Sequence, residues 1–188
     1  SMDLGERHGG LPPDHVVEDR DAILASTEAV ADRLHEPGRC EVVVAPCSPF
    51  SVSRELMVES AELARRRGLR MHTHLCETPE ETAYCLETHG RRPVELMDEW
   101  GWLGDDVWLA HAIHLLPDEI ERLGATGTGA AHCPSSNARL AAGMCPVTDL
   151  EAAGAPVGLG VDGVASNEVG RLQPELRQAL YTARQRAG

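Results

Sequence analysis

The chain has 188 residues, of which 42% are hydrophobic and 25% are charged. This length and composition are typical of one globular domain with a substantial core. The chain carries 30 acidic and 17 basic residues, a formal net charge of −13, and every basic residue is arginine. An acidic surface repels phosphate backbones and anionic lipid headgroups, so we expect no nucleic acid and no membrane as partner. The lack of lysine excludes any mechanism that needs a lysine Schiff base.

Three further features of the sequence indicate where in the cell the protein is located. The sequence has no apolar run of about 18 residues, the length that spans a bilayer. Its polar start has no apolar signal-peptide core. The six cysteines, at positions 40, 47, 76, 85, 133 and 145, show no spacing of a disulfide framework. We interpret them as reduced thiols and predict a cytoplasmic protein.

The hydrophobic pattern alternates between helical spacing and short β-branched runs. After an irregular lead-in over 1–18, the long loop 134–147 is the other irregular stretch, rich in Pro, Gly, Ser and Asn. In chain order the pattern predicts helix 19–35, strand 41–46, helix 53–67, strand 69–75, helices 79–88 and 93–100, strand 107–113, helix 117–124, strand 128–134, helix 148–154, strand 156–162 and a last helix from about 172 to 186.

Strands that alternate with helices in this way are typical of βα units in a parallel sheet. The sequence therefore predicts an α/β fold. We expect a single domain over residues 1–188, in which the βα units occupy 19–188.

Polar residues that can bind metal follow several of the predicted strands. His72, His74 and Glu77 come at and after the second strand, His111 closes the third, and Asp162 closes the fifth. In a parallel sheet or barrel these carboxyl ends lie on one face, where such folds place their sites. Imidazole nitrogens and carboxylate oxygens suit Zn²⁺ or Fe²⁺. The pattern therefore predicts a metal site.

Simpler interpretations remain open for individual residues. We expect His72 and His74 to face opposite sides of their strand, so that only one reaches the interior, and spacing does not choose between them. Likewise one of His111 and His114 is expected to be structural. Asp162 could cap the turn that follows it. The remaining histidines that we place on loops or helix surfaces are His8, His15, His35 and His89.

A series of motifs resembles the amidohydrolase superfamily, in particular its cytosine-deaminase-like branch of 8-oxoguanine deaminases, guanine deaminases and triazine chlorohydrolases. The resemblance runs over nearly the whole chain, and the order of the motifs is more specific than any one of them. The matching stretches are GGLPPD at 9–14, VAPCSPF at 44–50, HTHLCET at 72–78, GWLGDDVWLAHAIHL at 101–115, GTGAAHCPSSNARL at 127–140 and GLGVDGVASNE at 158–168.

This resemblance implies a metal-dependent (β/α)₈ barrel, of which the chain would hold about strands 4 to 8. It implies that His74 is a metal ligand, that Glu77 is a proton shuttle and that His111 orients the water or the substrate. Asp162 would contact the metal and take the proton of the attacking water. Substrate contacts would lie in the loop that contains Ser135, Ser136, Asn137 and Arg139.

The implied reaction is hydrolytic deamination of a purine-like small molecule, with one divalent metal, Zn or Fe. Expulsion of chloride from a triazine is an alternative. The family's first strand carries a further H-x-H pair, whereas H-x-H occurs here only at 72–74. We therefore expect a partial barrel that binds little metal and is inactive alone, and that self-associates or pairs with the missing barrel portion. A non-catalytic fragment that assembles in this way is a further alternative.

Overall fold

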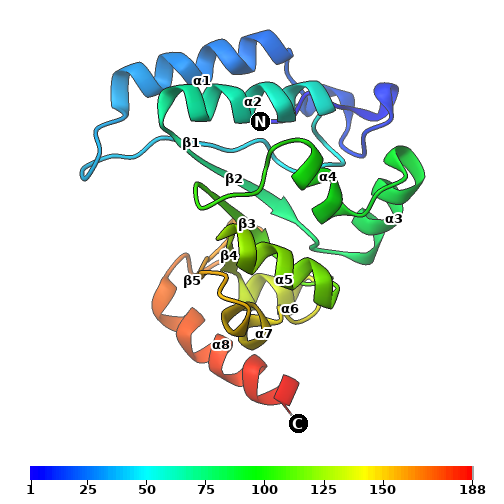
Figure 1. The fold of residues 1–188 in the computed structure, drawn as a ribbon, viewed down its shortest axis with the longest axis vertical. Coiled ribbons are helices and arrows are strands. Elements are labelled where there is room, and N and C mark those ends of the chain that lie inside the picture. The colour runs from blue at the N-terminus through cyan, green and yellow to red at the C-terminus, as the bar shows by residue number, and fades with distance from the viewer. Residues whose placement is uncertain (188) are drawn as a thin grey trace. The chain divides into compact units, whose positions relative to one another are not determined.

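The computed structural model describes residues 1–187, and it confirms the predicted α/β class. Its strands form one sheet in the order β1-β2-β3-β4-β5, with helices between successive strands (Figure 1). The elements are α1 (Arg20–Leu34), β1 (Val43–Val44), α2 (Arg54–Arg67), β2 (Arg70–Leu75), α3 (Pro79–His89), α4 (Pro93–Glu99), β3 (Val107–His111), α5 (Pro117–Thr126), β4 (Gly129–His132), α6 (Pro134–Arg139), α7 (Val147–Ala152), β5 (Val157–Leu159) and α8 (Leu172–Ala187). Two short 3-10 turns, Glu6–His8 and Asp14–Val16, interrupt the lead-in.

Every predicted strand is present, and each is shorter than predicted. The described pairs β1–β2, β3–β4 and β4–β5 are all parallel, and in the described residues β1 and β5 form the two open edges of the sheet. The sheet is therefore not closed into a barrel. One prediction was wrong: residues 134–139 form helix α6 and not an irregular loop. Pro134 occupies the first turn of this helix, a position where its missing N–H costs nothing.

The chain divides into two compact units, which are described separately. The first contains Ser1–Thr73 and Tyr84–Trp102, and the second contains His74–Ala83 and the residues from Leu103 onward. The expectation of a single domain stays a prediction.

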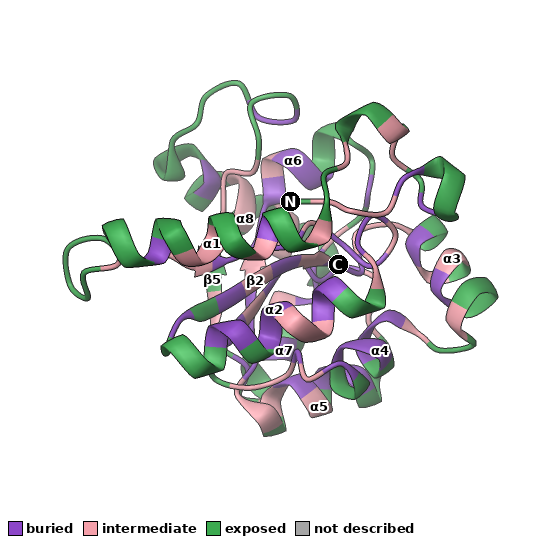
Figure 2. Cartoon of the chain, turned by 90° about the horizontal axis from the view of Figure 1, so that it is seen from above, coloured by how far each residue is buried: buried purple, intermediate pink, exposed green. Residues whose placement is uncertain are grey.

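In the first unit, α1 lies beside α2 (Figure 1). The Asp19 carboxylate accepts the Ala22 N–H at 2.9 Å and so caps the start of α1. The two helices are linked by exposed ion pairs, Arg66 with Glu28 and Arg67 with Asp32. Such exposed pairs add little stability. Figure 2 shows α1 as mostly exposed, whereas α2 presents a continuous buried face.

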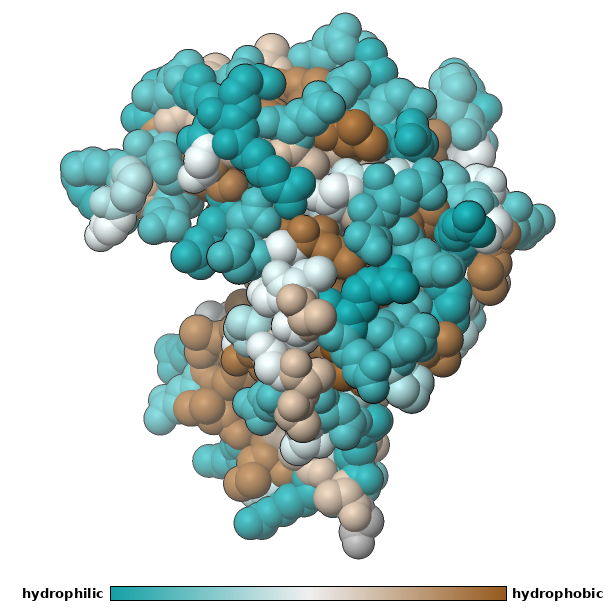
Figure 3. Space-filling model, in the orientation of Figure 1, coloured by the Kyte–Doolittle hydropathy of each residue, from teal (hydrophilic) through white to brown (hydrophobic). Residues whose placement is uncertain are grey.

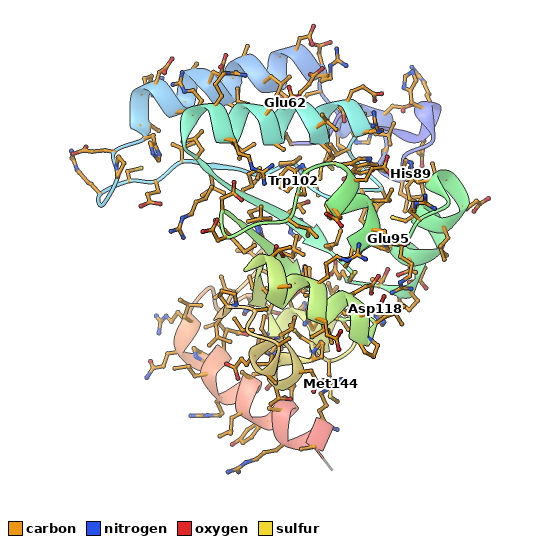
Figure 4. All side chains as sticks on the ribbon, viewed as in Figure 1. Glu62, His89, Glu95, Trp102, Asp118 and Met144 are labelled. Atoms are coloured by element: carbon orange, nitrogen blue, oxygen red, sulfur yellow. The ribbon has the colours of Figure 1, made fainter. Side chains whose placement is uncertain are left out.

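The core of this unit forms under α2. Leu56, Met57 and Ala64 of α2 are fully buried, as is Met97 of α4. Trp102 follows α4 and is also fully buried, and its indole Nε1 donates to the Met57 carbonyl at 2.8 Å (Figure 4). This hydrogen bond satisfies the one polar atom of the largest side chain in the core.

In the second unit, β3, β4 and β5 are paired in register through Leu109, Ala130 and Val157. Helices α5 and α7 cover this part of the sheet with the fully buried Leu123 and Leu150. The two helices approach so closely at Gly124 that an added Cβ would lie 2.0 Å from the Ala153 carbonyl oxygen. Only glycine fits at that position.

Helix α8 exposes an apolar stripe. Leu172, Leu176 and Leu180 repeat every four residues and are 54%, 63% and 48% exposed, and Tyr181 lies beside them. Figure 3 shows hydrophobic surface over this helix. The expectation that the chain self-associates or pairs with a further barrel portion stays a prediction. In the described part of the chain, no helix is long and apolar enough to cross a membrane.

The expectation that His72 and His74 face opposite sides of β2 was wrong. Residues two apart on a strand share a face, because successive side chains alternate. Both histidines are half-buried, and they alternate with the buried Met71, Thr73 and Leu75. Which of the two histidines reaches the end of the strand is therefore decided by its position along β2 and not by the face on which it lies.

We expect Trp102→Phe to lower the free energy of unfolding by about 1–3 kcal/mol, because it removes the donor to Met57 and leaves a void in a dense core. Urea denaturation followed by far-ultraviolet circular dichroism measures the change. Tyr181→Phe is the matched control, since this aromatic side chain is 56% exposed and its change is expected to stay within about 0.5 kcal/mol. Equal effects of the two substitutions would contradict the role of Trp102.

Candidate metal and proton-transfer site

Three side chains, from the end of β2, the end of β3 and the segment after β5, meet in the second unit. Ligand atoms of His74, His111 and Asp162 all lie within 4.8 Å of one another. The two imidazole rings are stacked, with centroids 5.5 Å apart, and His111 Nε2 lies 3.9 Å from Asp162 Oδ2. The sequence predicted all three residues, and the structure brings them together.

Glu77 lies beside this cluster. Its Oε1 is 3.7 Å from His111 Nε2, and its side chain is about one-fifth exposed. The turn that carries it begins at Cys76, whose φ of +55° lies in the left-handed region that non-glycine residues rarely adopt. A carboxylate in this place can exchange protons with a molecule bound at the cluster.

The fully buried carboxylate of Glu81 holds this turn. One oxygen accepts the Cys76 N–H and the other accepts the Glu77 N–H, each at 2.9 Å. Burial raises the pKa of Glu81 to about 7, and the two backbone hydrogen bonds oppose part of that rise.

His111 is oriented by Asn137. The His111 Nδ1 and the Asn137 Oδ1 are 2.8 Å apart, and both residues are buried. An amide oxygen only accepts hydrogen bonds, so Nδ1 is the donor and carries a proton. In the neutral imidazole, Nε2 then presents its lone pair on the side of Glu77 and Asp162. His114 instead contacts the Ala142 carbonyl at 2.8 Å, outside the cluster.

Asp162 lies in a dense set of hydrogen bonds. Its Oδ2 accepts from Ser136 Oγ at 2.5 Å and from Ser166 Oγ at 3.1 Å, and its Oδ1 accepts the Gly163 N–H at 2.7 Å. Burial alone would raise the pKa of this carboxyl, but these hydrogen bonds and the nearby His111 outweigh burial and lower the pKa below its ordinary value. Asp162 is therefore ionised and able to bind a cation.

The backbone is strained where the strands end. His111, Ala112 and Asp162, like Cys76, have positive φ values, of +71°, +47° and +62°. Such conformations cost about 1–3 kcal/mol each and persist only where surrounding contacts enforce them. They aim side chains away from the direction that regular strands would give.

Helix α6, which follows β4, contributes contacts in several ways. Glu175 of α8 is buried and accepts the Ser135 N–H at 3.0 Å and the Asn167 side-chain amide at 2.9 Å. It thereby joins α6 to the segment after Asp162. Arg139 is exposed and forms an ion pair with Glu168. Contact of Ser135, Asn137 and Arg139 with a substrate stays a prediction.

A buried histidine lies near His111. His132 is 3% exposed, and in the part of the chain that the structure describes its Nδ1 has no hydrogen-bond partner. Burial lowers the pKa of His132 below its ordinary value. With Asn137 and Met144 (Figure 4), it lines a cavity of about 220 Å³, which has room for water that can satisfy such atoms.

The donor set fits a divalent transition metal. Two imidazole nitrogens and one ionised carboxylate oxygen are ligands that zinc and iron accept. Asn137 and the two serines hold His111 and Asp162 in place, as the partners of metal ligands commonly do. His74 and Asp162 would hold the ion in this chain, and His111 would stand beside it, with Nε2 free to face the water or the substrate.

Sequence reasoning missed Glu81, Glu175 and Ser166 and gave Ser136 no link to Asp162. A signal existed only for Glu81, because Thr78-Pro-Glu-Glu81 is the pattern of a helix capping box. The other contacts join segments that are distant along the chain, and no local sequence pattern predicts them.

Comparison with known proteins gives consistent results. Residues 9–188 match the model of the "Amidohydrolase family". The 8-oxoguanine deaminase of Pseudomonas aeruginosa is 54% identical over 191 residues, which cover all of this chain and 42% of that protein. An isoxanthopterin deaminase of an unknown prokaryotic organism is 45% identical, covering 91% of this chain and 36% of that protein. The crystal structure of atrazine chlorohydrolase from Arthrobacter aurescens, complexed with zinc, matches with a TM-score of 0.90 at 33% identity, covering 94% of this chain and 40% of that one.

His74→Ala is expected to weaken Zn²⁺ binding by about tenfold or more, because it removes one of three clustered ligand atoms. Competition with a chromophoric chelator measures the dissociation constant. The control is His72→Ala, the same change two residues earlier on the same strand face, for which we expect less than about a threefold effect. A larger loss from His72→Ala would show that the wrong histidine has been assigned to the cluster.

The stability of the chain is expected to fall at acid pH through His132. A histidine whose pKa is lowered by folding stays neutral in the folded chain while the unfolded chain takes up a proton. This contribution is complete above a pH of about 6.5, the unfolded value, and is lost as the pH falls toward the lower folded pKa. Urea denaturation between pH 5 and 7.5 should therefore show a steeper pH slope for the unsubstituted chain than for His132→Asn.

His15→Asn is the matched control for this measurement, since His15 is exposed. It should leave the slope unchanged. An unchanged slope in His132→Asn would rule out His132 as the origin of the pH dependence.

Proposed function

Because the chain belongs to the amidohydrolase family, we propose that its site serves hydrolytic deamination of an aminated, purine-like heterocycle, with 8-oxoguanine as the first candidate substrate. The observation that carries this proposal is the meeting of His74, His111 and Asp162 within 4.8 Å, beside the Glu77 carboxylate. A cation-binding cluster next to a carboxylate suits the addition of water to a ring carbon and the departure of an amine.

The chain's residues divide this work. When bound, a divalent metal such as zinc or iron lowers the pKa of a water toward neutrality and so supplies the nucleophile. Asp162 accepts the proton that the attacking water gives up, and His111 orients that water or the substrate. Glu77 gives its proton to the ring nitrogen and then receives the proton that Asp162 took from the water. It passes this second proton to the departing amine, and the new hydroxyl group returns a proton to Glu77, so that water and the aminated ring become a ring carbonyl beside an N–H, and ammonia. Proton transfers of this kind contribute about 10²–10⁴-fold each.

The choice of substrate rests on the relatives. Two curated relatives are named for deamination of bicyclic, nitrogen-rich rings, 8-oxoguanine and isoxanthopterin. The chain spans about two-fifths of the length of the curated relatives it matches, so the activity and substrate of the whole protein are part of the proposal.

Release of chloride from a triazine is the second candidate. Its support is the zinc-complexed atrazine chlorohydrolase, whose fold matches this chain with a TM-score of 0.90. Both reactions begin with attack of water on an electron-poor ring carbon, and they differ in the group that leaves.

A chimera tests the proposal most directly. This chain replaces the aligned segment of the Pseudomonas aeruginosa 8-oxoguanine deaminase, to which it is 54% identical. With zinc, the chimera is expected to release ammonium from 8-oxoguanine, and Glu77→Gln in this chain is expected to lower kcat by about 10²-fold or more.

Chloride release from atrazine, measured in parallel, separates the two candidates. Chloride release without ammonium release would replace the first candidate by the second. Full activity of the Glu77→Gln chimera would remove Glu77 from the proposed proton transfer. The 188-residue chain alone, assayed beside the chimera, shows how much activity its own residues support.

A further inference from the structure

Three helices of this chain begin with the same local pattern. In α3, α4 and α5, proline occupies the first helical position and glutamate the third: Pro79 with Glu81, Pro93 with Glu95, and Pro117 with Glu119. A glutamate at this third position ordinarily turns back to accept the N–H of the residue that precedes the helix. Such a contact stabilises the helix start.

Two of the three glutamates act in this ordinary way. Glu95 (Figure 4) accepts the Arg92 N–H at 2.9 Å, and Glu119 accepts the Leu116 N–H at 2.7 Å. In both cases the acceptor and the N–H are three residues apart. These contacts stabilise the starts of α4 and α5 and involve no residue of the candidate site.

Glu81 reaches further. Its two oxygens accept the N–H groups of Cys76 and Glu77, five and four residues back, each at 2.9 Å. Its own N–H contacts the Thr78 hydroxyl at 3.4 Å, which supplies only one half of a capping box. The carboxylate therefore binds the turn between His74 and Glu77.

That turn needs support, and it is held from two sides. Cys76 has a φ of +55°, a strained conformation for a residue with a side chain. Its N–H is bound by Glu81, while its carbonyl accepts the Ile113 and His114 N–H groups, each at 3.0 Å. The Leu75 carbonyl likewise accepts the Ala112 N–H at 3.0 Å. The turn is thus tied to the backbone that follows His111.

The hydrogen bonds from the turn to the Glu81 carboxylate are buried, so their loss would be costly. Glu81 is 2% exposed and Cys76 is fully buried, so the Cys76 N–H could not turn to water in the absence of Glu81 without moving the turn. An unsatisfied buried N–H and a strained φ together favour rearrangement of residues 75–78.

We propose that Glu81 is a positioning residue, which fixes the turn after β2 and so holds the Glu77 carboxylate in register with His74 and His111. In part this rests on the proposed function, since Glu77 is there the proton shuttle. The positioning itself is a property of the folded chain. Glu81 touches neither metal nor substrate in this proposal.

The test compares Glu81→Gln with Glu119→Gln. Both replace a buried carboxylate at the third position of a helix in the same unit by an amide of the same size. Both are expected to reduce stability. Only Glu81→Gln is expected to speed hydrogen exchange at the Cys76 and Glu77 amides, by about tenfold or more, and to weaken Zn²⁺ binding by about tenfold.

The chimera with the Pseudomonas aeruginosa enzyme adds a readout for Glu77. There Glu81→Gln is expected to lower kcat by about tenfold or more with less than a threefold change in KM, because the displaced Glu77 acts in proton transfer. Glu119→Gln is expected to leave both constants within about threefold.

Amide exchange decides the proposal independently of function. If the chain bound no zinc and the chimera released no ammonium, the proposed function would fail, while faster exchange at Cys76 and Glu77 in Glu81→Gln alone would still support the positioning. Unchanged exchange at these two amides would overturn the positioning. Equal losses of zinc affinity in Glu81→Gln and Glu119→Gln would also overturn it, since Glu81 would then be an ordinary helix cap.

Discussion

Parallel strands deliver their carboxyl ends to one edge of a sheet, and the candidate site depends on this constraint. It allows His74, His111 and Asp162, which are far apart along the sequence, to place ligand atoms within 4.8 Å of one another. The strands alone do not complete the arrangement. His111 and Asp162 adopt positive φ, so the chain leaves the extended conformation at residues of the candidate site. The site is built where regular structure stops.

Buried polar contacts then stabilise these irregular turns. Glu81 holds the turn before Glu77, Asn137 orients the His111 ring, and Ser136 and Ser166 hold the Asp162 carboxylate. Each of these contacts also satisfies a polar group that would be costly to bury alone. The same hydrogen bonds therefore favour both the fold and the geometry of the site. Replacing one partner would leave another buried polar group without its hydrogen bond.

The sequence predicted that five strands are present and that histidines or acids lie at or after their ends, because two independent patterns agreed: β-branched runs indicated the strands, and histidines or acids interrupted them. It overestimated strand length because residues such as Asp162 continue the apolar run in sequence while the backbone has already turned. Helix α6 was missed because Pro134 suggests a break, although proline is also favoured in a first helical turn. His72 and His74 lie on one face of β2, because side chains along a strand repeat with a period of two.

The contacts that orient the side chains of the candidate site could not have been predicted in the same way. Ser136 bonds Asp162 across 26 residues, and Asn137 bonds His111 across 26 residues. These pairs are set by how α6 packs against neighbouring strand ends, which depends on the whole fold. Glu81 could have been predicted in part. Its local motif, a proline and a glutamate at the start of a helix, is the same as that of Glu119, but its carboxylate accepts different N–H groups.

The two candidate reactions differ in the number of protons that the site must supply. An amine is a poor leaving group unless it is protonated, whereas chloride leaves as an anion and needs no proton. A site with Glu77 near the cluster, and with Asp162 kept ionised by its hydrogen bonds, has both a donor and an acceptor for protons. Deamination uses both of these groups in full, and expulsion of chloride leaves the second protonation by Glu77 without a purpose. This difference in proton demand is the physical reason for placing deamination before chloride release in the proposal.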